Sequence, residues 1–527
     1  MPHDERARSR REVLGGTAAL AGAALFASAS ATAAAAATPA GPAARRGKDE
    51  AFALTHVTLI DATGAPPQND MTVLVRGRTI AAIGKTGALA VPADAKVLDL
   101  TGRFVIPGLV ESHVHSAGPE AVVPPLYALT GVTTVREMRG ESVHHRWRDR
   151  IASGALLGPR WIIGSPIIDG RPSLHTSDTG SLIEVADAAG ARAAVRRVKR
   201  EGADFVKVYS RLTRAAYFAI ADEARRQGIP YTGHCPDPVT IAEAVRAGHR
   251  TLEHMDAVLL ATSSREAEIR RGMAAITTDA SQDTFHRYHA WYQQVYPLEH
   301  IAVRSFDPQR TDALFDDLRR HARAVVPTLR VHQTLETPET NRKTDEWRYL
   351  PSGMTGWWAD VTEVMTGGRS PEQAARIREI FEHRKALVGR MHRAGVQVLA
   401  GTDTGNPYLV PGFALHEELE LLVQSGLTPM QALQAATNRP AQAFGMDAEV
   451  GTVEPGKRAD LVVLDADPLA DIRNTRRIDA LVVNGRLITS DERARLLADV
   501  EQAARSDQSQ TTAMAAGCAC AKHPSHA

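Results

Sequence analysis

The sequence has little cysteine, almost no net charge, and no long apolar run after its first forty residues. Three cysteines in 527 residues cannot cross-link a chain of this size, which excludes a disulfide scaffold. Lysine plus arginine (62) nearly equals aspartate plus glutamate (61), so no overall field attracts nucleic acid or a membrane surface. No later segment has the roughly 18 apolar residues of a bilayer-spanning helix, so we expect no stable membrane insertion. A hydrophobic content of 43% still supports a large globular core.

The first forty residues have the pattern of an export signal. Arginines precede an apolar, small-residue stretch over 13–29, and an alanine run follows it. Arg10-Arg11 and the residues around them also resemble the twin-arginine signal, whose cargo crosses the membrane already folded. We therefore predict that residues 1–40 direct export and leave a secreted or periplasmic protein. A basic disordered tail is the alternative.

The last residues, 501–527, are polar and rich in alanine, and they include Cys518, Cys520 and two nearby histidines. Tracts rich in cysteine and histidine can bind metal. The composition favours the simpler interpretation, which is a disordered tail with an incidental pair of thiols.

Two flanking stretches, 51–107 and 448–490, have the pattern of short strands separated by glycine and asparagine turns. We expect strands near 55–60, 72–75, 79–83 and 96–100 in the first stretch, and near 460–464 and 478–483 in the second. Neither stretch is long enough for a stable sheet domain alone. We therefore predict one small composite β-sandwich, built from both flanks and interrupted by everything between them.

The intervening stretch, 108–447, alternates apolar β-rich runs with helical patterns, which is typical of βα units and a parallel sheet. The eight runs that we identify should end near His115, Arg136, Gly164, Lys207, His234, His254, Leu329 and Asp403. Eight such units predict an α/β fold of the (β/α)8 TIM barrel type. A doubly wound open sheet is the alternative, but no glycine-rich phosphate fingerprint follows the first strand.

Helix starts and insertions are also predicted in this stretch. Ser181, Thr240 and Thr428 each precede a glutamate or glutamine by three residues, the pattern of a helix capping box. The segments 260–320 and 333–385 are too long for simple connections, so we expect helical insertions that shape a pocket.

The most informative side chains lie where the predicted barrel strands end. His113 and His115 stand at positions i and i+2, so both project from the same face of an extended strand. Two neutral imidazoles in this arrangement can converge on one cation. The His-x-His pattern alone is only moderately specific for a metal site.

Lys207 lies between valines in a predicted buried strand, although the chain has only nine lysines against 53 arginines. Burial disfavours the ammonium form and lowers the lysine pKa. A neutral amine can add carbon dioxide and become a carbamate, whose two oxygens can bridge two metals. A lysine that extends its ammonium to the barrel mouth is the alternative.

Three further side chains end apolar runs. His234 and His254 follow Lys207 at intervals that fit successive βα units, although either histidine alone is more often an ordinary polar residue than a ligand. Asp403 ends the run 397–402 and could bind metal, accept a proton from bound water, or do both. A cap for the next helix is the alternative for Asp403.

In combination these motifs resemble the amidohydrolase superfamily, nearest to its imidazolonepropionase-like and Xaa-Pro-dipeptidase-like branch. The resemblance covers about residues 54–488, and it includes Pro107-Gly108-Leu109 before the histidine pair and a closing signature over 451–461. The chain departs from the pattern at Cys235-Pro236 and at Met255-Asp256, each directly after a single histidine. We expect both departures to change the shape of the pocket more than the binding of the metals.

The resemblance implies a distorted barrel with a composite sandwich, and two divalent metals, usually zinc. It assigns His113, His115 and Asp403 to one metal. It assigns His234 and His254 to the other metal, with N6-carboxylated Lys207 as the bridge.

The chemistry expected of such a site is hydrolysis of an amide bond in a small molecule through a hydroxide that bridges the metals. Asp403 would take the proton from the attacking hydroxide and pass it to the leaving nitrogen. Tyr209, on the same strand face as Lys207, is a candidate hydrogen-bond donor to the developing oxyanion, or simply a wall residue. His175, in the loop after the third strand, is a candidate substrate contact.

Two other functions stay open at this point. A mononuclear deaminase or cyclic-amide hydrolase would hold one metal and an unmodified Lys207. A non-catalytic relative would keep the barrel only as a binding or assembly module, but such relatives typically lose ligands and this chain keeps all six. Barrels of this kind often pair, so a homo-oligomer is expected.

Overall fold

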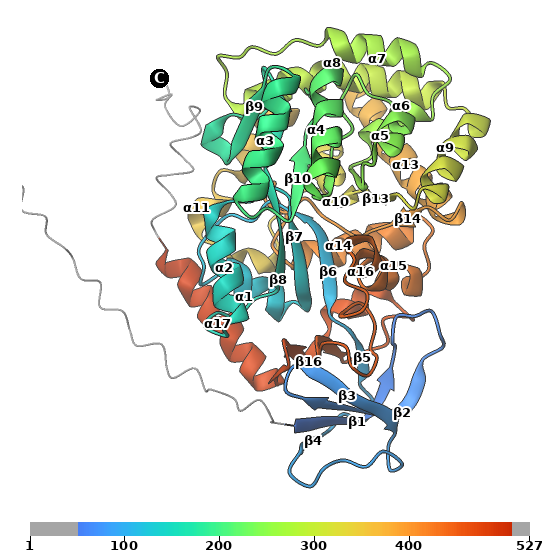
Figure 1. Ribbon diagram of the computed structural model, residues 1–527. Coiled ribbons are helices and arrows are strands. Elements are labelled where there is room, and N and C mark those ends of the chain that lie inside the picture. The colour runs from blue at the N-terminus through green and yellow to red at the C-terminus, as the bar shows by residue number, and fades with distance from the viewer. Residues whose placement is uncertain (1–50, 508–527) are drawn as a thin grey trace, which may run out of the picture. The chain divides into compact units, whose positions relative to one another are not determined.

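The computed structural model describes residues 51–507 (Figure 1). The predicted export signal at 1–40 and the cysteines Cys518 and Cys520 lie outside these residues. The described chain contains two sheets, a small one from the two flanks and a larger parallel one from the middle.

The small sheet joins strands from both flanks in the order β17-β16-β15-β5-β1-β2-β3, with β4 paired to β1. Its strands are β1 (Ala51–Leu59), β2 (Gln68–Arg76), β3 (Thr79–Lys85), β4 (Lys96–Asp99), β5 (Phe104–Pro107), β15 (Leu461–Leu464), β16 (Ile478–Val483) and β17 (Arg486–Ile488). The flanks meet where β5 pairs antiparallel with β15, and Leu54, Val105 and Val463 share one buried core. Both flanks thus contribute to one sheet, and its description as a sandwich domain stays a prediction.

The larger sheet is parallel and follows the order β14-β13-β12-β11-β10-β8-β7-β6, with β9 paired to β8. Its strands are β6 (Leu109–Val114), β7 (Val132–Glu137), β8 (Arg160–Gly170), β9 (Leu182–Val185), β10 (Phe205–Val208), β11 (Tyr231–Gly233), β12 (Thr251–Glu253), β13 (Ala324–Val326) and β14 (Gln397–Val398). Most of their residues are buried, as expected for parallel strands covered by helices.

Backbone hydrogen bonds join the two edges of this curled sheet. The chain after β14 runs beside β6, where Ser112 N donates to Ala400 O at 3.0 Å. Asp403 N donates to His113 O at 2.9 Å, and His115 N donates to Thr404 O at 2.6 Å. The arrangement is consistent with the predicted TIM-like barrel. It also places the ends of the first and last strands side by side.

Helices connect the parallel strands and form the insertions. They are α1 (Val123–Leu129), α2 (Ser142–Ala152), α3 (Ala188–Arg200), α4 (Arg214–Gln227), α5 (Ile241–Ala247), α6 (Asp256–Ala261), α7 (Glu266–Ala275), α8 (Thr284–Arg304), α9 (Pro308–Arg320), α10 (Leu329–Glu336), α11 (Ser352–Thr355), α12 (Trp358–Thr366), α13 (Pro371–Arg393), α14 (Phe413–Gln424), α15 (Pro429–Ala435), α16 (Asn438–Phe444) and α17 (Ser490–Ser506). The segments 260–320 and 333–385 are largely helical, as predicted.

Two of the three predicted capping boxes are present, at Thr240 before α5 and Thr428 before α15. The third prediction, at Ser181, is wrong because the next residues form β9 instead of a helix. The apolar β-branched pattern of β9 suits a strand, which pairs with β8. Glu184, the expected cap partner, accepts a hydrogen bond from Ser173 N at 3.0 Å.

Several predicted boundaries of strands, and that of the C-terminal tail, also differ from those in the structure. The third strand continues past Gly164 to Gly170 because Ile167 and Ile168 extend its apolar run. The seventh strand ends at Val326, and Leu329 begins α10, since Pro327 has no N–H with which to extend a ladder. Asp403 lies beyond the end of β14, in irregular backbone. Residues 501–506, predicted as part of the tail, belong to α17.

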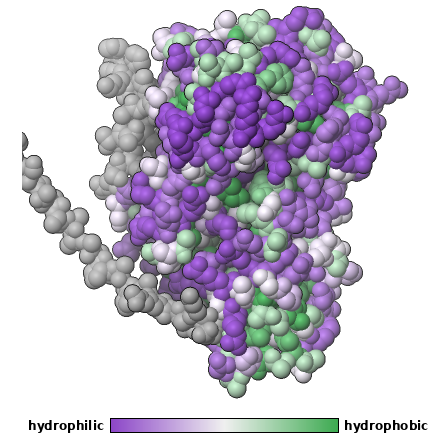
Figure 2. All heavy atoms as spheres, viewed as in Figure 1, coloured by the Kyte–Doolittle hydropathy of each residue, from purple (hydrophilic) through white to green (hydrophobic). Residues whose placement is uncertain are grey.

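The face of the protein in Figure 2 is mostly hydrophilic, with apolar side chains gathered mainly over the small sheet. Val97 of β4 is the one large hydrophobic residue that is exposed in the described range. Among residues 51–507, no helix combines the length and the apolar character that crossing a bilayer requires.

Candidate metal centre

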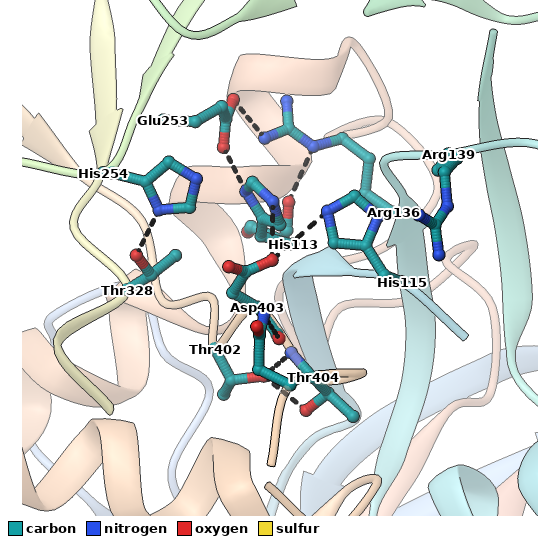
Figure 3. Close-up of polar contacts among 12 residues, drawn as sticks. His113, His115, Arg136, Arg139, Glu253, His254, Thr328, Thr402, Asp403 and Thr404 are labelled. Carbon is teal, nitrogen blue, oxygen red and sulfur yellow. Dashed lines mark hydrogen bonds and ion pairs between the residues drawn. The ribbon is translucent and has the colours of Figure 1, made fainter. Parts of the chain in front are cut away.

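Three of the predicted ligands converge where β6 and the chain after β14 lie side by side (Figure 3). Asp403 Oδ1 lies 3.2 Å from Nε2 of His113 and 3.2 Å from Nε2 of His115. One ligand atom from each of the three residues falls within 4.8 Å of the others. Adjacent strand ends therefore bring together two imidazoles and a carboxylate that are almost 290 positions apart in sequence.

The two single histidines continue this cluster. The ring of His254 lies 4.9 Å from that of His113, and the ring of His234 lies 4.7 Å from that of His254. Their Nδ1 atoms form hydrogen bonds of 2.7 Å, His254 with Thr328 and His234 with Ser210, which leaves Nε2 of each ring for a ligand. Burial lowers the pKa of His254 to about 3 and that of His234 well below its usual value, so both are in the neutral form that binds metals.

Lys207 lies on β10 and is fully buried, as the sequence predicted for it. Burial lowers the pKa of its amine to about 8, although the charges of Glu253 and Asp403 oppose the shift. Its Nζ forms no hydrogen bond with any described residue. A buried amine with a lowered pKa and no partner is suited to carboxylation.

Unpartnered buried atoms provide a test of whether a cation fits here. His113 Nε2, Lys207 Nζ and Asp403 Oδ1 are all buried and form no hydrogen bond within the described chain. Such atoms are rare in native proteins and require an explanation. Imidazole nitrogens with a carboxylate oxygen are a donor set that zinc accepts, so these residues fit a divalent metal.

A buried network that the sequence analysis missed orients His113. Glu253 Oε2 accepts a hydrogen bond from His113 Nδ1 at 2.8 Å, and Arg136 Nη2 donates to Glu253 Oε1 at 2.7 Å (Figure 3). Burial would raise the pKa of the Glu253 carboxyl, but Arg136 and His113 hold it well below its usual range. An ionised Glu253 fixes the tautomer of His113 and leaves Nε2 facing Asp403. The position of Glu253 directly before His254 was the available signal.

The Glu253→Gln variant is expected to bind metal roughly 10- to 100-fold more weakly, the usual effect of removing such a supporting carboxylate. Competition with a chromophoric chelator would measure the affinity. Glu454→Gln is the matched control, since Glu454 is half exposed near the small sheet and pairs with Lys457. Equal metal affinity in the Glu253→Gln variant and the wild type would show that the network does not support a metal.

Strained backbone also gathers at this centre. His254, Thr328 and Asp403 have φ angles of +66°, +46° and +63°, a region that residues other than glycine rarely adopt. Such strain is retained only where the surrounding structure enforces it, and it is concentrated at functional sites.

The predicted substrate contacts lie together beside the centre. Tyr209 follows β10 directly, and its hydroxyl lies 3.1 Å from His175 Nε2. Its ring is 3.9 Å from the ring of His234. Tyr288 of α8, which the sequence analysis did not identify, binds both the Tyr209 hydroxyl and His175. Helix α8 belongs to an insertion whose docking no strand pattern could predict.

A cavity of about 380 Å³ opens over these residues. The predicted site residues that line it are His115, His175, Tyr209, His234, His254 and Asp403. Arg139, another residue that the sequence analysis missed, also lines it and contributes a positive charge near His115. His113 and Lys207 lie fully buried.

Known proteins share both sequence and fold with this chain. Residues 316–488 match the amidohydrolase family. An 80-residue stretch is 44% identical to imidazolonepropionase of Symbiobacterium thermophilum, covering 15% of this chain and 19% of the relative. A 113-residue stretch is 30% identical to adenine deaminase of Clostridium botulinum, covering 21% and 18%. A solved Bifidobacterium longum structure assigned as a prolidase is 26% identical with a TM-score of 0.60, covering 86% of this chain and 100% of that one.

The family match over residues 316–488, the local identity to imidazolonepropionase and the similarity to the solved prolidase structure all agree with the resemblance to the amidohydrolase superfamily that the sequence motifs indicate. The alignments with the curated relatives span only about a fifth of each relative's length.

Proposed function

We propose that the protein is a metal-dependent hydrolase of a carbon–nitrogen bond, most directly an amide bond in a small molecule, built on a distorted (β/α)8 barrel. The observation that carries the proposal is the convergence of His113, His115 and Asp403, next to the imidazoles of His234 and His254, beside a cavity of about 380 Å³. The match of residues 316–488 to the amidohydrolase family supports the same reaction class.

The proposed ligands of one metal are His113, His115 and Asp403, and those of a second are His234 and His254. Carboxylated Lys207 is the proposed bridge between the two. Divalent ions such as zinc supply an activated water and polarise the substrate carbonyl. The buried, neutral imidazoles of His115, His234 and His254 support this assignment, as does the unpartnered Lys207 Nζ.

Asp403 is the proposed general base and acid. Burial alone would raise the pKa of its carboxyl, but the imidazoles of His113 and His115 hold it well below its usual range. Asp403 is therefore ionised and able to accept the proton of the attacking water before transferring it to the leaving nitrogen. It also lines the cavity, so its carboxylate is accessible to the substrate.

Tyr209 and His175 are proposed to contact the substrate. Burial raises the pKa of the Tyr209 hydroxyl well above its usual value, so it keeps its proton and can donate a hydrogen bond to a developing oxyanion. The bond to His175 Nε2 holds the hydroxyl beside the ring of His234.

A substrate panel tests the proposed function. Purified protein of measured metal content would be incubated with dipeptides, N-acyl amino acids, lactones and phosphotriesters, and the products separated by chromatography. We expect amide cleavage that a chelator abolishes and divalent metal restores. Cleavage only of the lactones or phosphotriesters would overturn the assignment to carbon–nitrogen bonds.

A mononuclear deaminase is the second candidate, favoured by the local identity to adenine deaminase. It differs from the first in two measurable respects, since it would release ammonia and hold one metal with an unmodified Lys207. Assaying ammonia release from aminopurines, together with the metal content, distinguishes the two.

We also propose export by the twin-arginine route, supported by Arg10-Arg11 before the apolar stretch. Folding before translocation would allow metal to be loaded into a buried site inside the cell. Replacing Arg10 and Arg11 with lysine should retain the protein in the cytoplasm, measured by fractionation and immunoblotting. Unchanged export of the double variant would contradict this route.

A further inference from the structure

One end of the cavity contains a buried cluster of charged side chains. Arg384 of α13 places Nη1 3.0 Å from Asp256 Oδ1. Its Nη2 and Nε lie 2.8 Å from Glu299 Oε2 and 3.0 Å from Glu336 Oε1. Arg384, Glu299 and Glu336 are at most 3% exposed, and all four residues line the cavity.

The carboxylates of this cluster outnumber its cation. Three carboxylates face the single guanidinium of Arg384, and no second lysine or arginine pairs with them among residues 51–507. Two of these carboxylates, Glu299 and Glu336, are almost fully buried, and a buried carboxylate is costly unless a cation pairs with it. Three carboxylates around one guanidinium therefore form a site that suits a further cation.

Two buried atoms at this end have no hydrogen-bond partner. The Nδ1 atom of His332 lies 3.0 Å from Glu336 Oε1. Neither His332 Nε2 nor Glu336 Oε2 forms a hydrogen bond within the described chain, and both residues line the cavity. His332 is 8% exposed, so bulk water has little access to its imidazole. An unpaired carboxylate oxygen beside two further carboxylates is what an ammonium or guanidinium group requires.

An aromatic wall connects this end of the cavity to the candidate substrate contacts. Helix α8 turns one face toward the cavity, with lining residues spaced mostly three or four apart. They include Phe285, Tyr288, Tyr292, Val295, Tyr296 and Glu299. The helical rise places Tyr288, which binds His175, about 16 Å from Glu299, which binds Arg384. The stacked rings of Tyr292 and Tyr296 lie between them, and the guanidinium of Arg369 lies over the Tyr296 ring.

The charged end also adjoins the candidate metal centre. The ring of His332 lies 6.2 Å from that of His254. Asp256 follows His254 by two residues, at a point where the sequence departs from the family pattern. One small molecule can therefore contact this end of the cavity and the metal centre together.

We propose that Asp256, Glu299, Glu336 and His332, together with Arg384, form a specificity subsite for a cationic group of the substrate, an alkylammonium or a guanidinium. The substrates are then amides that carry a lysine-like or arginine-like side chain. The cleavage part of this inference rests on the proposed function, whereas binding of the cation does not.

The wild-type protein provides the first test, in two independent measurements. The first compares kcat/KM for Lys-Ala, norleucine-Ala and Glu-Ala, and for the reversed series Ala-Lys, Ala-norleucine and Ala-Glu. In at least one series, we expect the lysine member to exceed the norleucine member by about tenfold or more. The second measures binding of n-butylguanidinium by calorimetry, with n-pentanol as the uncharged control. We expect heat of binding from the cation only.

The Glu336→Gln variant provides the second test, because it keeps the side-chain volume and removes one negative charge. We expect it to lower the lysine-to-norleucine ratio by about tenfold and to weaken n-butylguanidinium binding by a similar factor. Glu339→Gln is the matched control, since Glu339 is half exposed, pairs with Arg378 and does not line the cavity. It should preserve both values. If Glu336→Gln does not fold, the two wild-type measurements still test the cationic subsite.

The outcomes separate this inference from the proposed function. Amide cleavage with no preference for lysine and no binding of n-butylguanidinium would overturn the cationic subsite and leave the hydrolase proposal intact. Binding of n-butylguanidinium without cleavage of any amide would support the subsite and overturn the hydrolase proposal.

Discussion

The Asp403→Asn variant should lose turnover by roughly 10²–10⁴-fold or more, the usual contribution of a positioned general base. Asparagine keeps the shape of the side chain and one ligand oxygen, but it cannot accept the proton. The carboxylate of Asp403 is ionised and lies 3.2 Å from two imidazoles, so its removal affects both proton transfer and metal binding. Metal content should therefore fall only modestly while turnover collapses. Steady-state kinetics alongside elemental analysis would measure both.

A matched control separates the role of Asp403 from a general effect of losing a carboxylate. Asp316→Asn removes an exposed carboxylate on α9 that pairs with Arg319. It should leave turnover and metal content unchanged. Near-normal turnover in Asp403→Asn would show instead that another group transfers the proton.

The Lys207→Ala variant should lose most activity and hold about one metal per chain where the wild type holds about two. Without a bridging anion, two cations held close together repel strongly. A carbamate on Lys207 would supply one negative charge and one oxygen to each metal. Short carboxylic acids added to the variant should partly restore activity by occupying the same space.

The control for Lys207→Ala is Lys199→Ala, since Lys199 is an exposed residue of α3. It should retain the metal content and the activity of the wild type. Intact-mass analysis of gently handled wild-type protein should show the added mass of carbon dioxide. Full activity and full metal content in Lys207→Ala would show that Lys207 bridges nothing.

The candidate ligands could be identified because each lies in or shortly after a recognisable strand. His113 lies in β6 and His115 directly after it, and Lys207 is a rare lysine inside an apolar run on β10. In a parallel sheet that curls, such strand ends meet at one mouth. Local sequence patterns were therefore enough to predict that these residues, far apart along the chain, lie close together in the fold.

The supporting residues could not be predicted in the same way. Arg136 and Glu253 lie on strands that are not neighbours, so their ion pair across the sheet interior depends on how the sheet curls. Thr328, which binds His254, adopts a left-handed conformation that its sequence does not indicate. Such contacts depend on tertiary packing, which cannot be inferred from the pattern of a single sequence.

The insertions were predictable as helices but not as cavity walls. The capping residue Asp283 and the apolar spacing define α8, yet which face it turns toward the cavity depends on its packing against α12 and α13. The ion pairs of Arg384 join α6, α8, α10 and α13, four helices whose arrangement no strand pattern specifies. The cationic subsite therefore emerges only from the three-dimensional arrangement.

Metal reconstitution tests the central claim most directly. The protein would be stripped with a chelator, titrated with zinc in the presence of bicarbonate, and assayed on a cleavable amide at each step. We predict negligible activity in the stripped protein and a rise that ends at about two zinc ions per chain, with the carbamate mass present. Full amide hydrolysis by the stripped protein would contradict the account. Full activity at one metal per chain with unmodified Lys207 would contradict the binuclear site and favour the mononuclear candidate.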